Sequence, residues 1–109
     1  MDSKQLMAQD SRSVMQTYGR FPVAIDHGQG ACLYSPEGKK YIDFTSGIGV
    51  NCLGYGNEKW IAAVTEQAGK LAHLSNLYYS EPYIKLSKVL TERTGMSRVF
   101  FANGGGEAN

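Results

Sequence analysis

Apolar residues recur every three or four positions in three stretches of the chain, and each stretch predicts a helix. The first covers residues 3–16. The second runs from a cap at Asn57 to about residue 74, with its apolar side chains on one face. The third begins after Ser80, has Pro82 in its first turn, and has Gly95 in the place of a C-terminal cap.

Strands are predicted where the helical spacing is absent and β-branched and aromatic residues are frequent. Residues 31–34 and 40–44 flank the sequence Ser35-Pro36-Glu37-Gly38. Proline at the second turn position and glycine at the fourth fit a type I turn, so these segments predict an antiparallel hairpin. Residues 23–25 are expected to be extended, and the apolar run 98–102 predicts a buried strand.

Glycine is more frequent than usual, with 13 residues in 109, roughly 12% against an average of about 7%. Four of these glycines lie within residues 45–56, which predicts an irregular loop that some other group approaches closely. Gly104, Gly105 and Gly106 follow the strand expected at residues 98–102 and precede a Glu-Ala pair typical of a helix start.

The order of strand, glycine loop and helix start is typical of a phosphate-binding cradle. Glycines allow the backbone N–H groups to face an anion, and the first turn of a helix adds further donors. The loop is not a Walker motif, because no Gly-Lys-Ser/Thr follows, and Gly47-Ile48-Gly49 is not a dinucleotide motif, because position 52 is Cys. A flexible loop with no ligand remains the alternative.

Composition and charge narrow the choice of function. The chain is 42% hydrophobic and 19% charged, which is typical of a globular protein, and its net charge of +1 gives no basic excess for nucleic acid. No apolar run matches a membrane span and the N-terminus lacks a secretory signal, so a cytoplasmic location is expected. Cys32 and Cys52 lack zinc-site spacing, His27 and His73 lack a triad pattern, and no metal site is expected.

Five motifs in a fixed order carry a resemblance to a known family. They are Tyr18–Val23, Lys40–Phe44, Ser46–Ile48, Ser75–Pro82 and Phe100–Asn103. Together they resemble the N-terminal quarter of acetylornithine aminotransferases, which belong to the class III aminotransferases of fold type I and use pyridoxal 5'-phosphate.

The resemblance implies an α/β fold of which this chain is an incomplete N-terminal part. Residues 1–74 are then the N-terminal segment of a small α+β domain that contains the hairpin. Residues 75–109 begin the large, doubly wound cofactor domain with its first helix and strand. The family also implies a homodimer, with residues 76–79 near the dimer interface.

The implied reaction moves the ω-amino group of N2-acetylornithine to 2-oxoglutarate through pyridoxal phosphate, in arginine biosynthesis. The resemblance assigns the cofactor phosphate to Gly104, Gly105 and Gly106, and it places Tyr18 and Ile48 on the substrate side. The Schiff-base lysine and the other catalytic groups lie downstream in the family. The chain by itself is therefore expected not to catalyse transamination.

Other interpretations remain open. A related ω-aminotransferase would act on ornithine, succinylornithine or 4-aminobutyrate, and a truncated remnant would serve only as an interaction module. A small phosphate-binding protein is disfavoured, because one strand cannot support such a site. Two departures from the family stand out: Gly104 and Gly106 replace Ser and Ala, and Gly54–Glu58 replaces Gly-His-x-His-Pro.

Overall fold

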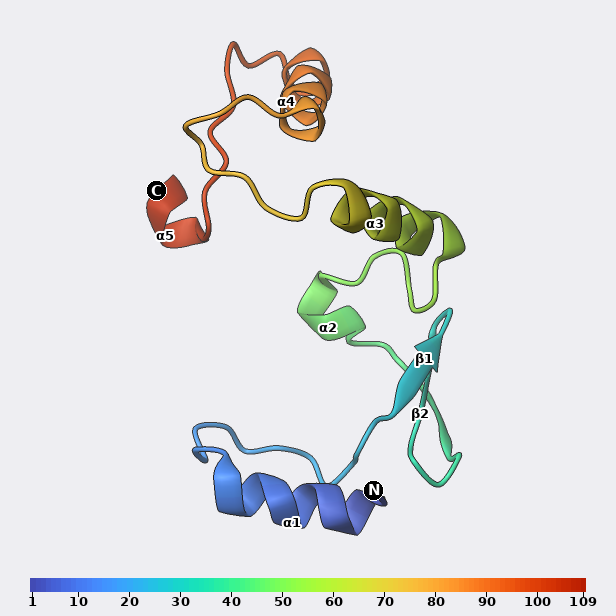
Figure 1. Cartoon of the computed structure of the whole chain (residues 1–109). Coiled ribbons are helices and arrows are strands. Elements are labelled where there is room, and N and C mark those ends of the chain that lie inside the picture. The colour runs from blue at the N-terminus through green and yellow to red at the C-terminus, as the bar shows by residue number, and fades with distance from the viewer. The chain divides into compact units, whose positions relative to one another are not determined.

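The computed structural model describes residues 1–109, which divide into two compact units, Met1–Glu66 and Gln67–Asn109. Figure 1 labels the helices and strands along the chain. Their order is α1 (Ser3–Ser13), β1 (His27–Gln29), β2 (Cys32–Tyr34), β3 (Lys40–Ile42), α2 (Ser46–Gly49), α3 (Glu58–Lys70), α4 (Glu81–Thr94) and α5 (Gly105–Ala108). None of the helices combines the length and apolar content needed to cross a membrane.

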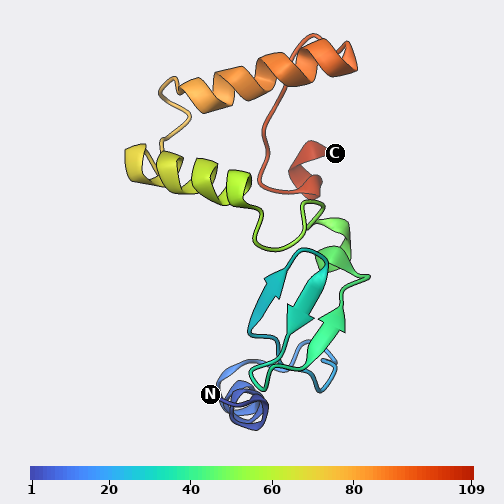
Figure 2. The ribbon, with the colours of Figure 1, turned by 90° about the vertical axis from the view of Figure 1, so that its right-hand side faces the viewer.

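The first unit contains an antiparallel sheet with the strand order β1-β2-β3, seen side by side in Figure 2. Leu33 on β2 lies opposite Gly28 on one side and Tyr41 on the other. The N–H of Gly38 donates to the carbonyl of Ser35 at 2.9 Å, and this closes the turn of the predicted hairpin. The hairpin prediction is confirmed, whereas the third strand, β1, was not predicted.

Local capping groups set the ends of the helices. Asp2 and Gln5 form a reciprocal capping box at the start of α1. The Asn57 side chain accepts from the N–H of Trp60 at 3.0 Å, as predicted, and Gly95 ends α4 with a left-handed φ of 73°. The helices α1 and α3 end at Ser13 and Lys70, a few residues earlier than the periodicity predicts.

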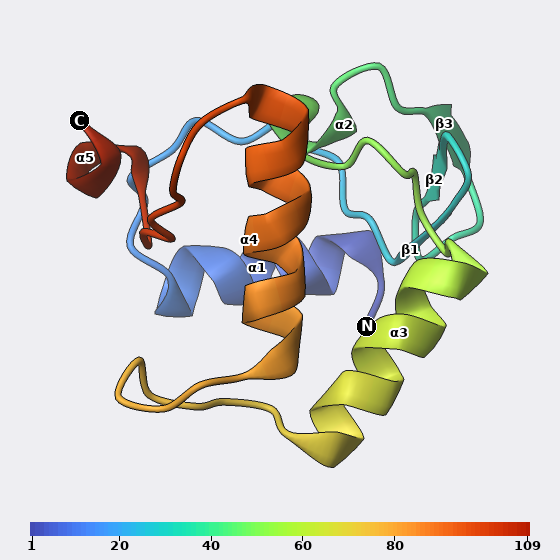
Figure 3. The ribbon, with the colours of Figure 1, turned by 90° about the horizontal axis from the view of Figure 1, so that it is seen from above.

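The strand predicted at residues 98–102 does not form, so that prediction is wrong for this chain. A strand is defined by hydrogen bonds to a neighbouring strand, and no segment of the chain pairs with these residues. The Phe101 ring packs instead against Tyr83 of α4, with the ring centroids 5.1 Å apart. Figure 3 shows the chain passing from α4 to α5 without an intervening strand.

Hydrophobic side chains are not buried in this chain. Ser35, in the hairpin turn, is the one buried residue at 4% exposure, and its hydroxyl accepts from the N–H groups of Glu37 and Lys39. Trp60 on the predicted apolar face of α3 is 57% exposed, and Phe44 after β3 is 91% exposed. The apolar faces predicted by the periodicity are present, but this chain does not cover them.

Candidate functional site

The short element α2, Ser46–Gly49, is a left-handed turn. The sequence predicted an irregular loop here from its glycines. Ser46, Gly47, Ile48 and Gly49 all have positive φ, between 47° and 79°. The N–H of Gly49 donates to the carbonyl of Thr45 at 3.0 Å, which closes the turn. A β-branched residue with positive φ is rare, because its Cβ crowds the following carbonyl at a cost of about 1–2 kcal/mol.

Ile48 is the one bulky side chain that projects from this turn. Its side chain is 95% exposed, and the glycines on either side place no other bulky group beside it. Tyr18, the other predicted substrate-side residue, lies between α1 and β1 and is 76% exposed. Each side chain extends into solvent from a different segment, so this chain does not by itself form a closed pocket around them.

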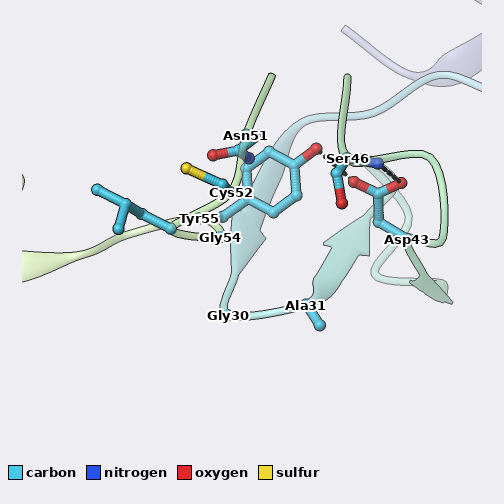
Figure 4. A pocket seen from close by; sticks show the side chains of 9 residues that line it. Gly30, Ala31, Asp43, Ser46, Asn51, Cys52, Gly54 and Tyr55 are labelled. Carbon is cyan, nitrogen blue, oxygen red and sulfur yellow. Dashed lines mark hydrogen bonds between the residues drawn. The ribbon is translucent and has the colours of Figure 1, made fainter. Parts of the chain in front are cut away.

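The carboxylate of Asp43 holds the beginning of the turn. Its Oδ1 accepts from the Thr45 N–H at 2.8 Å, from the Thr45 hydroxyl at 2.7 Å and from the Ser46 N–H at 3.0 Å. Its Oδ2 accepts from the hydroxyl of Tyr55 at 2.7 Å. Both carboxylate oxygens are therefore engaged, and Figure 4 shows Asp43, Ser46 and Tyr55 around one pocket.

These hydrogen bonds keep Asp43 ionised. The side chains of Thr45 and then Tyr55, followed by the Thr45 N–H, lower the pKa of Asp43 from 3.8 to about 2. The same contact raises the pKa of Tyr55, because the carboxylate favours the protonated phenol, and a side-chain hydrogen bond with Asn51 opposes this. At neutral pH the pair is a carboxylate that accepts and a phenol that donates.

Tyr55 is itself fixed to the sheet. Its N–H and carbonyl exchange two hydrogen bonds with Gly30, each 2.9 Å long. A Cβ at Gly28 would lie 2.3 Å from Cγ of Tyr55, so glycine is required there to make room for the ring. Tyr55 and Gly30 border a pocket of about 370 Å³, whose lining also includes Asp43, Asn51 and Cys52.

The glycine loop of the second unit is built differently. Gly104 is extended, with φ −165° and ψ 166°, and Gly105 begins α5. The Glu107 carboxylate accepts from the Asn103 N–H at 2.8 Å and closes this turn. The N–H groups of Gly104, Gly105 and Gly106 have no acceptor in the chain, and a Cβ at any of them would meet nothing within 4 Å.

An open row of free backbone donors is the donor set that a phosphate group requires. The residues of this loop therefore fit the phosphate of a cofactor such as pyridoxal phosphate. The helix start that the sequence predicts at Glu107 is confirmed by α5. The structure contains no group of His, Cys, Asp and Glu side chains arranged to hold a metal ion.

Asp43 and Tyr55 were not among the site residues predicted from the sequence. An Asp side chain often accepts from the backbone N–H two residues further on, and this signal was available at Asp43. Tyr55 was visible only as a departure, since it stands where the family pattern has histidine. The contact between the two spans 12 positions and follows from the fold of the sheet.

A comparison with known protein families identifies the family of this chain. Residues 13–109 match the family described as aminotransferase class-III. This match covers most of the sequence, and the chain belongs to the class III aminotransferase family.

Individual relatives agree with the family match. The acetylornithine aminotransferase of Haemophilus ducreyi is 50% identical over 109 residues, which are 100% of this chain and 28% of that protein. The crystal structure of acetylornithine aminotransferase from Elizabethkingia anophelis superposes with a TM-score of 0.93 at 30% identity, over 99% of this chain and 28% of that one. The fold is thus that of the N-terminal region of a fold type I aminotransferase, as the resemblance implied.

A third relative has a different named substrate. The ornithine aminotransferase of Toxoplasma gondii, in a structure described as having partial occupancy of PLP at its active site, gives a TM-score of 0.91 at 29% identity. The match covers 97% of this chain and 25% of that one. In each of these comparisons, the chain spans about a quarter of the length of its relative.

Proposed function

We propose that a complete enzyme carrying this segment transfers the ω-amino group of N2-acetylornithine to 2-oxoglutarate, as a step of arginine biosynthesis. The observation that carries the proposal is the 50% identity, over the whole chain, to a protein named acetylornithine aminotransferase. The five sequence motifs support the same assignment independently of any single relative.

In this proposal Gly104, Gly105 and Gly106 bind the phosphate of pyridoxal 5'-phosphate through their backbone N–H groups. The support is their open, unpaired geometry and the mention of PLP for the Toxoplasma gondii relative. When bound, the cofactor supplies the electron sink for amino-group transfer. The contribution of this chain is to hold and orient the phosphate group.

Tyr18 and Ile48 form part of the substrate side in this proposal. Both are exposed in the isolated chain and are therefore free to contact a substrate or another part of a complete enzyme. Residues 1–74 belong to the small domain and residues 75–109 open the large domain. The segment 76–79 contributes to a homodimer interface, supported by its aromatic residues Tyr78 and Tyr79, which are 67% and 92% exposed.

A second candidate function is transfer from ornithine itself. It is favoured by the structural likeness to the ornithine aminotransferase of Toxoplasma gondii, with a TM-score of 0.91. The two donors differ by the acetyl group on the α-nitrogen, so the substrate-side residues decide between them.

The test is a comparison of amino donors with 2-oxoglutarate as the common acceptor. The complete enzyme is assayed for glutamate formation with acetylornithine, ornithine, succinylornithine and 4-aminobutyrate. We expect kcat/KM for acetylornithine to exceed the others by about tenfold or more, the range that one well-placed contact provides. A preference for ornithine contradicts the first proposal and supports the second, and no turnover with any donor supports a non-catalytic module. The 109-residue chain alone serves as the inactive control.

A further inference from the structure

The left-handed turn at Ser46–Gly49 is intrinsically unfavourable. All four residues have positive φ, and Ser46 and Ile48 are not glycine. Its backbone is closed by the Gly49-to-Thr45 hydrogen bond and by the Asn51 N–H, which donates to the carbonyl of Ser46 at 2.8 Å. A strained backbone persists only where surrounding contacts enforce it.

Those contacts come from a pair of side chains anchored on the sheet. Asp43 directly follows β3, and its N–H donates to the carbonyl of Ala31 at 2.9 Å. Tyr55 is tied to Gly30 by two backbone hydrogen bonds of the same length. The neighbouring residues Gly30 and Ala31 thus fix both partners of the 2.7 Å hydrogen bond between the Tyr55 hydroxyl and Asp43.

From this geometry we propose that Asp43 and Tyr55 are positioning residues, which hold the Ser46–Gly49 turn and thereby determine where Ile48 stands relative to the substrate. The inference rests on the proposed function for the role of Ile48 but not for the mechanics of the turn. Asp43 acts directly through its contacts to Thr45 and Ser46. Tyr55 acts through Asp43, because its hydroxyl limits the orientations that the carboxylate can adopt.

Two substitutions weaken the contact with little change in shape. Tyr55→Phe deletes the hydroxyl and leaves the ring in the space beside Gly28. Asp43→Asn keeps an oxygen that accepts from Thr45 and Ser46 but removes the charge. The matched control is Tyr34→Phe, because Tyr34 lies on β2 of the same sheet and its side chain stacks on His27 rather than contacting the turn.

The first readout is amide hydrogen exchange in the complete enzyme without substrate. The N–H groups of Gly49, Val50 and Asn51 donate to carbonyls of the turn and report on its backbone hydrogen bonds. We expect their exchange to accelerate by about tenfold in Tyr55→Phe, the scale expected for losing one hydrogen bond to a charged group, and to be unchanged in Tyr34→Phe. Equal exchange in all variants overturns the proposal, whatever substrate the enzyme uses. Should Tyr55→Phe not fold, the same exchange measurement is made on Asp43→Asn, which is also expected to accelerate the exchange.

The second readout is the ratio of kcat/KM between the two best amino donors. Tyr55→Phe is expected to change this ratio in the native background and to leave it unchanged when Ile48 is already alanine, because the effect passes through Ile48. A change of equal size in both backgrounds overturns the role assigned to Tyr55. If the enzyme does not prefer acetylornithine, the proposed function fails. The amide exchange, and the dependence of the Tyr55→Phe effect on Ile48, still test whether Asp43 and Tyr55 position the turn.

Discussion

The chain has two glycine-rich segments that use glycine for opposite reasons. In the turn at Ser46–Gly49, Gly47 and Gly49 have φ of 61° and 79°, a conformation that side chains disfavour. In the loop at Gly104–Gly106, no residue has positive φ, and a Cβ at each glycine would meet open space. The first segment needs glycine for its shape, and the second leaves its backbone N–H groups accessible.

The hydrogen bonds that hold the two segments in place also differ. The turn is held by Asp43, which contacts Thr45 and Ser46, and Asp43 is held in turn by Tyr55, 12 positions along the chain. The loop is held from within by Glu107 on the N–H of Asn103, four residues away. Because Asp43 is fixed by a residue 12 positions away, the turn depends on the rest of its unit, whereas the loop depends on its own sequence. This difference gives opposite expectations for substitutions in the two segments.

The largest effect is expected at Gly54, in the segment that carries Tyr55. Its φ is 70° and a Cβ there would lie 2.7 Å from the carbonyl oxygen of Gly30. Gly54→Ala combines left-handed strain with a backbone clash, and we expect it to lower the free energy of unfolding by at least about 2 kcal/mol. Denaturant unfolding of the complete enzyme measures this. Gly19→Ala, where a Cβ meets nothing within 4 Å, is the control, and equal stability of the two variants contradicts the prediction.

Ile48→Ala tests whether the turn presents a residue for substrate choice. If Ile48 faces the substrate in the complete enzyme, its truncation is expected to change stability little. The ratio of kcat/KM for acetylornithine and ornithine should change by about tenfold or more, as for the loss of methylene contacts in a pocket. If the variant melts earlier but keeps the same substrate ratio, Ile48 packs within the complete enzyme and does not select the substrate.

A matched pair of alanine substitutions compares the segments directly. Gly49→Ala forces a side chain into the left-handed region and should cost about 1–2 kcal/mol of stability. Gly106→Ala lies inside α5, where alanine is favoured over glycine by up to about 1 kcal/mol. Thermal unfolding of both variants should therefore shift in opposite directions. A similar loss in both would mean that the loop, too, needs glycine for its shape.

The sequence predicted those parts of the fold that depend on neighbouring residues. The hairpin turn at Ser35–Gly38, the Asn57 cap and the Gly95 cap each involve contacts within four positions, and the structure has all three. The strand β1 escaped prediction although it pairs with β2 across only Gly30 and Ala31, because His27–Gln29 lacks the β-branched and aromatic residues that mark the other strands. The left-handed turn escaped prediction because Asp43, which holds it, is itself held by Tyr55, 12 positions along the chain.

The error at residues 98–102 arose because a strand requires a partner that local composition cannot supply. The site residues likewise divide into those that a local pattern reveals and those that depend on the fold. The loop at Gly104–Gly106 was found from its local pattern, and its phosphate role stays a prediction. The pair of Asp43 and Tyr55 became visible only once the sheet had brought the two residues together.

Gly104→Ser tests the accessible loop through cofactor binding. The serine that the family pattern has at this position would add a hydroxyl donor to the phosphate, and space for its Cβ exists. A hydrogen bond to a charged group is worth about 1.5–3 kcal/mol, and displacement of an ordered water reduces the gain, so we expect a severalfold lower Kd. Equilibrium dialysis of pyridoxal phosphate against the complete enzyme measures it. Unchanged or weaker binding by the serine variant would contradict the assignment of this loop to the phosphate.

The smallest effect concerns acid, and it separates the turn from the rest of its unit. The pKa of Asp43 is lowered from 3.8 to about 2 by hydrogen bonds from Thr45 and Tyr55. The pKa of Glu37 is lowered from 4.5 to about 2, mainly by the backbone and side chain of Ser3. A lowered pKa in the folded state means that each carboxylate stabilises the fold above its unfolded pKa. This contribution is lost as the pH falls from about 4.5 to about 2.

The acid effect is expected to be modest, because Glu37 is exposed and Asp43 is only partly buried, so that water screens their interactions. Amide exchange of Gly49 and Asn51 in the complete enzyme, corrected for the intrinsic effect of pH, should accelerate below about pH 4, where Asp43 becomes protonated in the opened turn before it does so in the closed one. Asp43→Asn should remove this acceleration, whereas Glu37→Gln should leave it in place, because Glu37 contacts Ser3 and not the turn. If acid affects the turn equally in all three proteins, Asp43 is not the group that holds it.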